Sequence, residues 1–296
     1  QQILDSYHAK LDEADENIRK GNNYSNGLLL SVQADVSDLK NKTTKNTASS
    51  SILQIIPFTS TIRWEVDYIQ KKGRLETIYN SFKYQEYCIN DLQKESLFGL
   101  SVKASLDKKN GMIPVLRMSN VINGELDFST LKYLPADCAS TEKEPQKWIL
   151  RKGDFLITRT NGSKDLIGKA AIFNSDETYT YASYLIRYRF DTTIVLPEYV
   201  NILFMTPLVR EQIAVMRRQG GGQYNLNSDE IGAIRLPVPS IPIQKQIIKK
   251  FFDAKDEAQI YYDAATKCQI EATVNFEKEN LSRRFPDCGE VFSGIQ

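Results

Sequence analysis

The chain has 296 residues, of which 41% are hydrophobic and 25% charged, values that are ordinary for a globular protein of one large or two small domains. No apolar run approaches the roughly 20 residues that cross a bilayer, and no secretory leader is visible at the start. The net charge of +1 excludes a strong positive field over the whole protein, so a site for an anionic partner has to be a local patch.

The four cysteines are widely scattered without a C-x-x-C pair, and the chain has one histidine. This pattern predicts neither a metal site nor a cofactor, and it indicates reduced structural thiols in a cytosolic protein. The chain opens on Gln1-Gln2 without an initiating Met, which slightly favours a segment cut from a longer polypeptide.

The first segment, residues 1–50, is predicted to hold a helix over residues 3–20 and then a linker. Apolar residues recur every three or four positions along this helix, and Gly21-Asn-Asn is expected to end it. This apolar stripe, the N-terminal seam, consists of Leu4, Tyr7, Leu11, Ala14 and Ile18. Asn41 to Ser51 contains a single apolar residue and indicates the linker.

Residues 51–241 mix helical and strand patterns, which is typical of an irregular α+β domain. Helices are predicted over Tyr68–Tyr84 and over Pro197–Arg218, the second with proline at its start. Turn signals such as Asn123-Gly124 separate several short β-rich runs. These runs are Ile113–Met118, Trp148–Leu150, Asp154–Thr158, Ala170–Phe173, Tyr184–Phe190 and Ala233–Pro237.

Residues 242–285 are predicted to form a long coiled-coil spacer helix, followed by a tail over 286–296. Its apolar stripe, the C-terminal seam, alternates intervals of four and three, which is a coiled-coil repeat kept over more than three heptads. The seam runs through Ile247, Phe251, Ala254, Ala258, Tyr261, Ala265, Cys268 and Ala272. The alternative is a surface helix packed on its own domain. Since the N-terminal helix covers only about half of this seam, we expect the rest to meet another partner.

Four sequence blocks between residues 96 and 227 stand in a fixed order ahead of the proline-rich connector and the long helix. They begin at Ser96 (SLFGLSVKA), Ile113 (IPVLRMSNVINGELDF), Lys152 (KGDFLITRTNGS, followed by IGK) and Gln223 (QYNLN). As a set they resemble a target-recognition domain from the DNA-specificity subunits (HsdS) of type I restriction–modification systems. Asn227 stands where that family usually has a hydroxyl residue.

The resemblance implies a β-rich target-recognition domain with a short N-terminal helix and a long C-terminal coiled-coil helix. It further implies a cytoplasmic module that reads double-stranded DNA and directs an adenine methyltransferase, and an associated nuclease, to its site. A whole HsdS subunit has two recognition domains and this chain has one. It is therefore expected to be either a half-subunit that pairs with a second copy or a segment of a longer fused protein.

The blocks are expected to place DNA-contacting side chains at the ends of short strands. Arg117 and Arg159 each end a strand and are suited to fork onto a phosphate or guanine, while amide side chains suit adenine. Glycines at 220–222 let backbone N–H groups approach a phosphate. The residues expected to contact DNA are Arg117, Ser119, Asn120, Arg159, Thr160, Asn161, Ser163, Lys164, Arg217, Arg218, Gln219, Gly221, Gln223 and Asn225.

Each assignment has a structural alternative. Arg117 and Arg159 are also placed to form internal ion pairs with Asp127 or Asp154. Arg217, Arg218 and Gln219 also suit a solvated helix C-terminus, where cations are favoured. Residues 161–164 also read as a plain hairpin tip.

Catalytic motifs are not found. The sequence contains no Asn-Pro-Pro-Tyr or Asp-Pro-Pro-Tyr tetrapeptide and no P-loop, and its single histidine, on a predicted helix, argues against a Ser–His site. Catalysis is therefore expected in a partner subunit or a fused domain. The competing hypothesis is a coiled-coil protein-assembly module without DNA binding, which the near-neutral charge favours.

Overall fold

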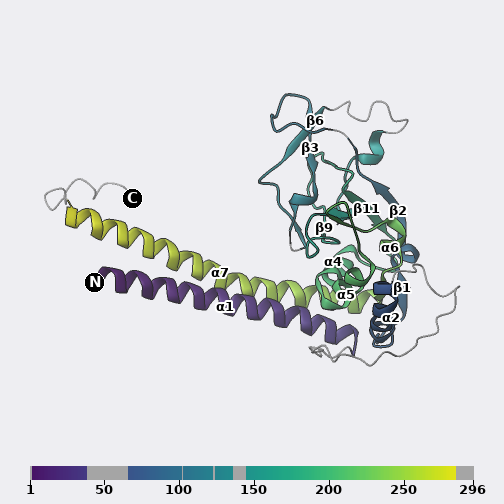
Figure 1. Ribbon diagram of the computed structural model, residues 1–296, viewed down its shortest axis with the longest axis horizontal. Coiled ribbons are helices and arrows are strands. Elements are labelled where there is room, and N and C mark those ends of the chain that lie inside the picture. The colour runs from purple at the N-terminus through teal and green to yellow at the C-terminus, as the bar shows by residue number, and fades with distance from the viewer. Residues whose placement is uncertain (1, 39–65, 102, 123, 136–144, 285–296) are drawn as a thin grey trace. The chain divides into compact units, whose positions relative to one another are not determined.

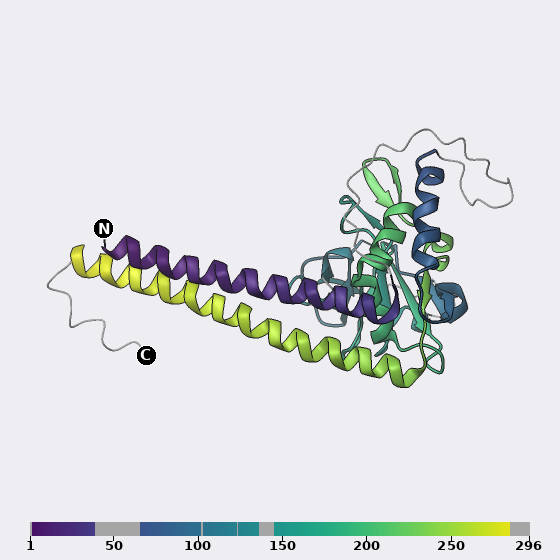
Figure 2. The ribbon, with the colours of Figure 1, turned by 90° about the horizontal axis from the view of Figure 1, so that it is seen from below.

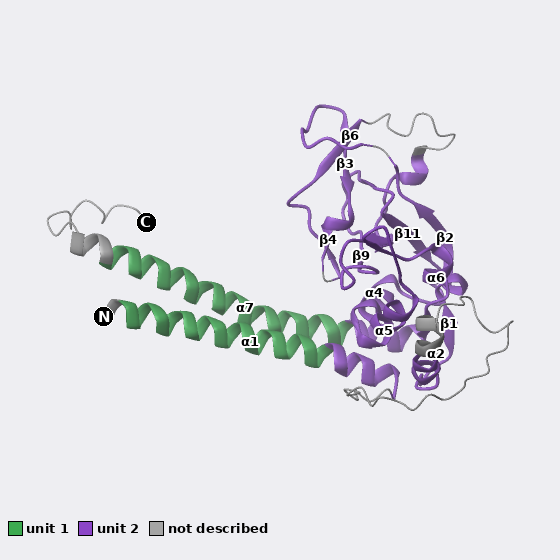
Figure 3. Cartoon of the chain, in the orientation of Figure 1, with its two compact units in different colours: residues 1–28, 249–296 green, residues 29–248 purple. Residues whose placement is uncertain are grey.

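A computed structural model of the chain is shown in Figure 1. It describes residues 2–38, 66–101, 103–122, 124–135 and 145–284. The chain divides into two compact units, residues 1–28 with 249–296 and residues 29–248 (Figure 3). The predicted mixed α+β class is confirmed. The predicted linker and tail lie outside the described residues, and no described helix has both the length and the apolar character that a membrane span requires.

Unit 1 is an antiparallel pair of helices from α1 (Gln2–Val36) and α7 (Ile241–Arg284). Figures 1 and 2 show the two helices side by side along this unit. The contacts run in opposite chain directions, because Tyr7 packs its ring 4.9 Å from that of Phe276 and Tyr24 packs its ring 6.4 Å from that of Tyr261. The pairing of these helices is therefore intramolecular.

The predicted end of the first helix at Gly21 is wrong, because α1 continues to Val36. An interior glycine destabilises a helix by only about 1 kcal/mol relative to alanine, and packing readily offsets that loss. At Gly21 the helices approach closely, since a Cβ built there would lie 2.9 Å from Cε1 of Tyr262. The Tyr262 hydroxyl donates to Oδ1 of neighbouring Asn22 at 3.0 Å. Gly21 thus belongs to the helix interface and does not cap the helix.

The described seam residues differ in exposure along the two helices. Ala14 packs with Ala265 and Cys268, with Ile18 against them, while Leu4 is 45% exposed. Tyr7, Leu11, Ile18, Ala254 and Tyr261 are half-buried. The buried seam positions of α7 are Ile247, Phe251, Ala258, Ala265, Cys268 and Ala272.

Unit 2 contains several small sheets in its described residues. An antiparallel four-stranded sheet has the order β2-β11-β7-β9, and a second sheet has β3 between β10, its parallel partner, and β6. The strands of these sheets are β2 (Gln93–Phe98), β3 (Met112–Leu116), β6 (Lys132–Pro135), β7 (Phe155–Thr158), β9 (Ala170–Ile172), β10 (Thr180–Tyr181) and β11 (Leu185–Phe190). Leu116, Leu156, Phe173 and Tyr181 form part of the core cluster that these strands share.

Two-stranded ladders and short helices complete the scaffold. They are α2 (Val66–Tyr79), β1 (Glu86–Cys88) paired with β14 (Arg235–Pro237), α3 (Ile89–Leu92), β4 (Val121–Ile122) paired with β5 (Glu125–Leu126), and the 3-10 turns η2 (Met118–Asn120) and η3 (Pro145–Trp148). Trp148–Leu150 is therefore not a strand as predicted. The Trp148 indole instead donates from Nε1 to the carbonyl of Phe98 at 3.0 Å, which closes the turn against β2.

The single helix predicted over Pro197–Arg218 is two helices, α4 (Pro197–Met205) and α5 (Pro207–Met216). Proline lacks an N–H and disfavours helical backbone in the residue before it, so Thr206 is extended, with ψ of 152°. The Thr206 hydroxyl donates to the carbonyl of Leu203 at 2.7 Å and closes the first helix. Helix α5 ends at Met216, and the residues that follow it form a strand.

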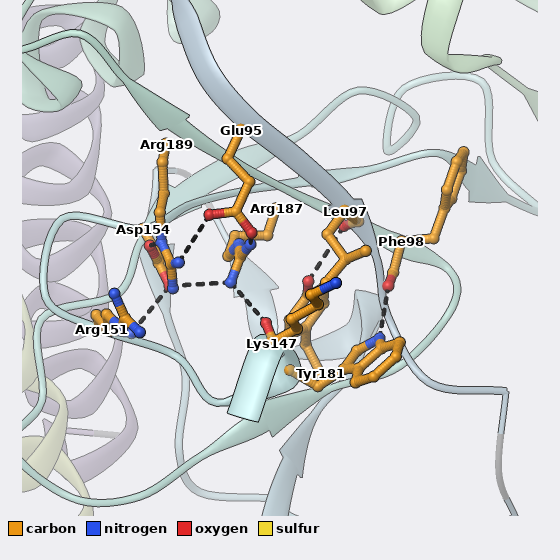
Figure 4. A network of polar contacts seen from close by, with 10 residues as sticks. Glu95, Leu97, Phe98, Lys147, Arg151, Asp154, Tyr181, Arg187 and Arg189 are labelled. Atoms are coloured by element: carbon orange, nitrogen blue, oxygen red, sulfur yellow. Dashed lines mark hydrogen bonds and ion pairs between the residues drawn. The ribbon is translucent and has the colours of Figure 1, made fainter. Parts of the chain in front are cut away.

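A buried ionic network ties β2, β7 and β11 together (Figure 4). The Arg187 guanidinium is fully buried, donates to the carbonyl of Lys147 at 2.7 Å and pairs with Glu95. Arg189 pairs with Asp154 at 2.6 Å and with Glu95 at 2.9 Å. Burial alone raises the pKa of the Glu95 carboxyl, but the Arg187 and Arg189 charges outweigh it and hold that pKa below its usual value. The network joins β2, through Glu95, and β11, through Arg187 and Arg189, to Asp154, which directly precedes β7.

Candidate nucleic-acid interface

The residues after α5, which include the three glycines at 220–222, form a β-hairpin. Strands β12 (Arg218–Gly220) and β13 (Gln223–Asn225) pair antiparallel around a two-residue turn. Gly221 and Gly222 have φ of 60° and 74°, a left-handed conformation that type I′ hairpin turns need at both central positions. A Cβ at either glycine would meet nothing within 4 Å, so the turn projects into open space.

The hairpin is fixed to a third strand, β8 (Thr160–Asn161), which joins it in the order β12-β13-β8. Tyr224 lies opposite Asn161, and Asn225 opposite Thr160. The Thr160 hydroxyl is nearly buried and donates to Oδ1 of Asn225 at 2.8 Å. Long-range pairing thereby brings strands from two of the three predicted groups, residues 159–164 and 217–225, into one sheet.

Directly paired residues in adjacent strands lie on the same face of a sheet, so the register sorts these side chains. Arg218, Asn225 and Thr160 share one face, and Gln219, Tyr224 and Asn161 share the other. On the first face Thr160 and Asn225 bond to each other, so these two side chains support the hairpin. Gln219, at the hairpin's edge strand, is exposed.

Arg210, in the N-terminal half of α5, and Arg217, directly after this helix, hold the loop that follows β8. Arg210 donates from Nη2 to the carbonyls of Asp165 at 3.1 Å and Ile167 at 2.9 Å. Arg217 donates from Nη1 to the carbonyl of Lys164 at 2.9 Å and stacks over the ring of Tyr224 at 5.4 Å. These side chains therefore hold the loop against the hairpin. Arg217 bonds only the backbone of Lys164, whose side chain is exposed to solvent.

The two segments that form this site, residues 159–169 and 210–225, carry an excess of positive charge, although the whole chain is nearly neutral. Residues 159–169 carry three basic side chains and one acidic one, and residues 210–225 have the same balance, whereas the whole chain carries +1. Burial, followed by the charge of Arg217, lowers the pKa of Arg210. Burial, followed by the charge of Arg210, lowers the pKa of Lys169. Concentrated cations of this kind attract phosphate, because an anion relieves their mutual repulsion.

Arg159 joins the hairpin to an exposed aromatic group on the neighbouring sheet. Its guanidinium lies over the ring of Phe98 at 5.0 Å, and its backbone N–H donates to the carbonyl of Tyr184 at 3.0 Å. Phe98 is 42% exposed and Tyr184 is 47% exposed. The sequence analysis also considered an ion pair between Arg159 and Asp154. In the structure the Asp154 carboxylate pairs with Arg187 and Arg189 instead.

The third predicted group lies outside the hairpin sheet, in the turn η2 that follows β3. Asn120 is fully buried and its amide donates to the carbonyls of Asp127 at 2.8 Å and Thr130 at 3.1 Å. Its Oδ1 accepts from the Arg117 N–H at 2.9 Å. The Asn120 amide is thus used to close the turn, which supports a structural role, and its expected contact with DNA stays a prediction. Ser119 is exposed and Arg117 half-buried, and their roles stay predictions.

Smaller contacts complete the predicted set. The Asn161 amide oxygen accepts from the Ser163 N–H at 3.0 Å, which shapes the turn after β8. Arg218 pairs with the nearly buried Glu230. Gln223 and Gly221 are exposed at the hairpin tip. Glu230, Arg210 and Lys169 were not among the predicted contacts. Lys169 carried a signal, since it is the lysine of the recognised IGK.

An antiparallel hairpin on a basic patch, supported by a small β-rich scaffold, is the arrangement of a nucleic-acid-binding domain. Residues 83–271 match the family described as the type I restriction modification DNA specificity domain. Because this match covers more than half of the chain, the protein belongs to that family. The resemblance drawn from the sequence blocks is confirmed.

Two curated relatives illustrate the likeness. The specificity subunit of the type I restriction enzyme EcoKI from Escherichia coli K12 is 28% identical over 186 residues, which is 60% of this chain and 38% of the relative. The StySPI specificity subunit from Salmonella potsdam is 25% identical over 138 residues, which is 47% of this chain and 28% of the relative. This chain thus matches well under half the length of either subunit.

A solved structure supports the fold independently of the sequence. A chain from work on complex assembly and conformational transition of the type I R-M system superposes with a TM-score of 0.55 at 8% identity. The superposition covers 95% of this chain and 58% of that chain. At such low identity the likeness concerns the fold alone.

Proposed function

We propose that this chain is the DNA-recognition module of a type I restriction–modification system and that the β12–β13 hairpin with β8 is its reading element. The observation that carries the proposal is the assembly of residues 159–164 and 217–225 on one basic three-stranded sheet. A two-stranded β-ribbon fits the major groove of B-DNA, where each base pair displays a distinct pattern of donors and acceptors.

We assign contacts with bases and contacts with phosphates to different side chains according to their solvent exposure and charge. Gln219 and Gln223, exposed amides near the hairpin tip, are placed to read base edges. Lys164, Arg217 and Arg159 supply positive charge for phosphates, with Phe98 and Tyr184 as apolar neighbours. Backbone N–H groups of the Gly221–Gly222 turn can approach a phosphate without side chains in the way.

Catalysis is proposed to lie in an adenine methyltransferase, as a partner subunit or a fused domain, which flips the target base out of the duplex that this chain positions. The paired helices of unit 1 are proposed as spacer and docking surface. A second copy of the chain is the other proposed partner of these helices, which would complete a split DNA site. The proposed location is the cytoplasm, where such a system meets DNA.

The competing hypothesis of a coiled-coil assembly module without DNA binding is not favoured by the family match. It also loses part of its support, because α1 and α7 pair within one chain. Salt dependence separates the two hypotheses.

We expect DNA affinity to fall steeply with salt. If five or six phosphates are contacted, a plot of the logarithm of the association constant against the logarithm of the salt concentration should have a slope of about −5. Each contact contributes about −0.9 to this slope through counterion release. Fluorescence anisotropy with a labelled duplex between low and moderate salt measures the slope. A flat response would favour the assembly hypothesis.

Substitution of Gln223 by alanine should weaken binding to the specific duplex by about 1–3 kcal/mol, because one base contact is lost from an exposed position. The melting temperature should stay unchanged. The matched control is Gln146→Ala, another exposed amide, in turn η3. Equal affinities of the two variants for the specific duplex would remove Gln223 from the reading element.

A further inference from the structure

The Arg218 side chain is held by a buried carboxylate that follows the hairpin. Glu230 is 4% exposed and its Oε1 accepts from Arg218 Nε at 2.6 Å. The Arg218 side chain is itself 47% exposed. One end of this ion pair is therefore fixed in the protein while the other reaches the surface of β12.

The second oxygen of Glu230 is fixed by the helix that carries it. Helix α6 (Ser228–Gly232) begins with Asn227, whose Oδ1 accepts from the Glu230 N–H at 2.7 Å. Oε2 of Glu230 accepts in return from the Asn227 N–H at 3.0 Å. This reciprocal capping box explains how asparagine serves at position 227, since it caps as well as serine does.

The carboxylate thus joins three parts of the interface: β12 through Arg218, the segment between β13 and α6 through Asn227, and α6 through its own backbone. Arg218 uses Nε for this bond, and no hydrogen bond of its two terminal nitrogens to the described residues is seen. These two nitrogens are the pair with which arginine grips a phosphate or guanine O6 and N7 in a bidentate fork. A guanidinium anchored through Nε loses little further freedom when it binds.

We propose that Glu230 is a positioning residue for DNA recognition, and that its buried carboxylate orients the Arg218 guanidinium toward the duplex. The inference rests on the proposed function of the hairpin. Glu230 itself does not touch DNA in this proposal, because it is buried and both of its oxygens are used.

The informative variant is Glu230→Gln. Glutamine keeps the size of the side chain and can still accept from the Asn227 N–H, so the capping box and fold are retained. Its amide, however, turns an N–H toward the Arg218 Nε–H, and the two donors cannot bond. We expect the affinity for specific DNA to fall about tenfold or more, which is the usual effect of losing one base or phosphate contact. The melting temperature should stay unchanged.

The probe is a duplex enriched from a random-sequence pool by the wild-type chain, with a scrambled duplex beside it. Wild type, Glu230→Gln, Arg218→Ala and the double variant form a double-mutant cycle. If Glu230 acts through Arg218, the double variant binds as Arg218→Ala does. Glu86→Gln is the matched control, because Glu86 pairs with Arg235 at 3.1 Å on a different sheet, and it should bind as wild type.

Wild-type affinity in Glu230→Gln, or a loss that adds fully to that of Arg218→Ala, would overturn the positioning role and leave the proposed function standing. No enriched duplex with the wild-type chain would overturn both. If Glu230→Gln lowers the melting temperature, the Arg218→Lys variant is measured instead, because lysine keeps the positive charge but lacks the bidentate guanidinium. It should lose about tenfold in specific affinity at an unchanged melting temperature, and full affinity would overturn the inference.

Discussion

Replacement of Asp154 by alanine is expected to destabilise unit 2 by about 3–5 kcal/mol, the usual loss when one partner of a buried ion pair is removed. The Asp154 carboxylate is 1% exposed, binds Arg189 through both oxygens and accepts from the Arg151 N–H at 2.9 Å. Its loss leaves the fully buried Arg187 and its neighbour Arg189 with Glu95 as the remaining carboxylate of the network in Figure 4.

Chemical denaturation of the variant and the wild type measures the effect directly. A change of this size should also lower the melting temperature by about 10 °C for a unit of this length. The control is Asp176→Ala, because Asp176 is 90% exposed in its pair with Lys152 and such pairs contribute at most about 1 kcal/mol. Equal stability of the two variants would mean that the buried network contributes little.

This network shows where sequence reasoning stops. Asp154 was considered as a partner for Arg117 or Arg159, the arginines in recognised motifs. Its actual partner Arg189 is 35 residues away along the chain and stands in a strand pattern that gave no reason to expect a buried charge. Which arginine meets a carboxylate depends on strand register, and periodicity along one strand does not determine the register between strands.

The same reasoning explains the mixed outcome at the candidate site. Thr160 and Asn225 lie 65 residues apart, and only the pairing of β8 with β13 brings them into contact. The motifs predicted which segments matter, because their polar and glycine residues are local features. They did not separate Asn120, which closes a turn, from amides that remain exposed, since both uses require the same donors and acceptors.

The helices were predicted well where a single periodicity decides them and less well at their ends. The four–three repeat indicated the long C-terminal helix, which the structure confirms as α7. Gly21 was read as a helix end because glycine is common there, but in the structure it makes room for Tyr262. Such a packing role depends on a residue about 240 positions away and leaves no local trace.

Introduction of glutamate at both Ala258 and Ala265 should separate α1 from α7 while unit 2 keeps its fold. Both alanines are 2% exposed, and Ala265 packs against Ala14 and Cys268. Each glutamate would place a charge without a partner in an interface of small side chains, which costs several kcal/mol. We expect amide hydrogen exchange in residues 7–24 to accelerate by about 100-fold or more, since local opening then needs correspondingly less free energy.

The matched control places the same two charges on the outer side of the same helix. Ile260 and Val274 are 65% and 53% exposed, so Ile260→Glu with Val274→Glu should leave hydrogen exchange in α1 unchanged. Sedimentation of both double variants, with and without the methyltransferase, then tests the proposed partners. Loss of assembly in the Ala258/Ala265 variant alone would mean that partners recognise the intact helix pair. Loss in the Ile260/Val274 variant would instead place the contact with the methyltransferase or a second copy on the outer apolar side chains of α7. Unchanged mass in every setting would restrict the helix pair to an intramolecular brace, and unchanged exchange in the Ala258/Ala265 variant would contradict the pairing itself.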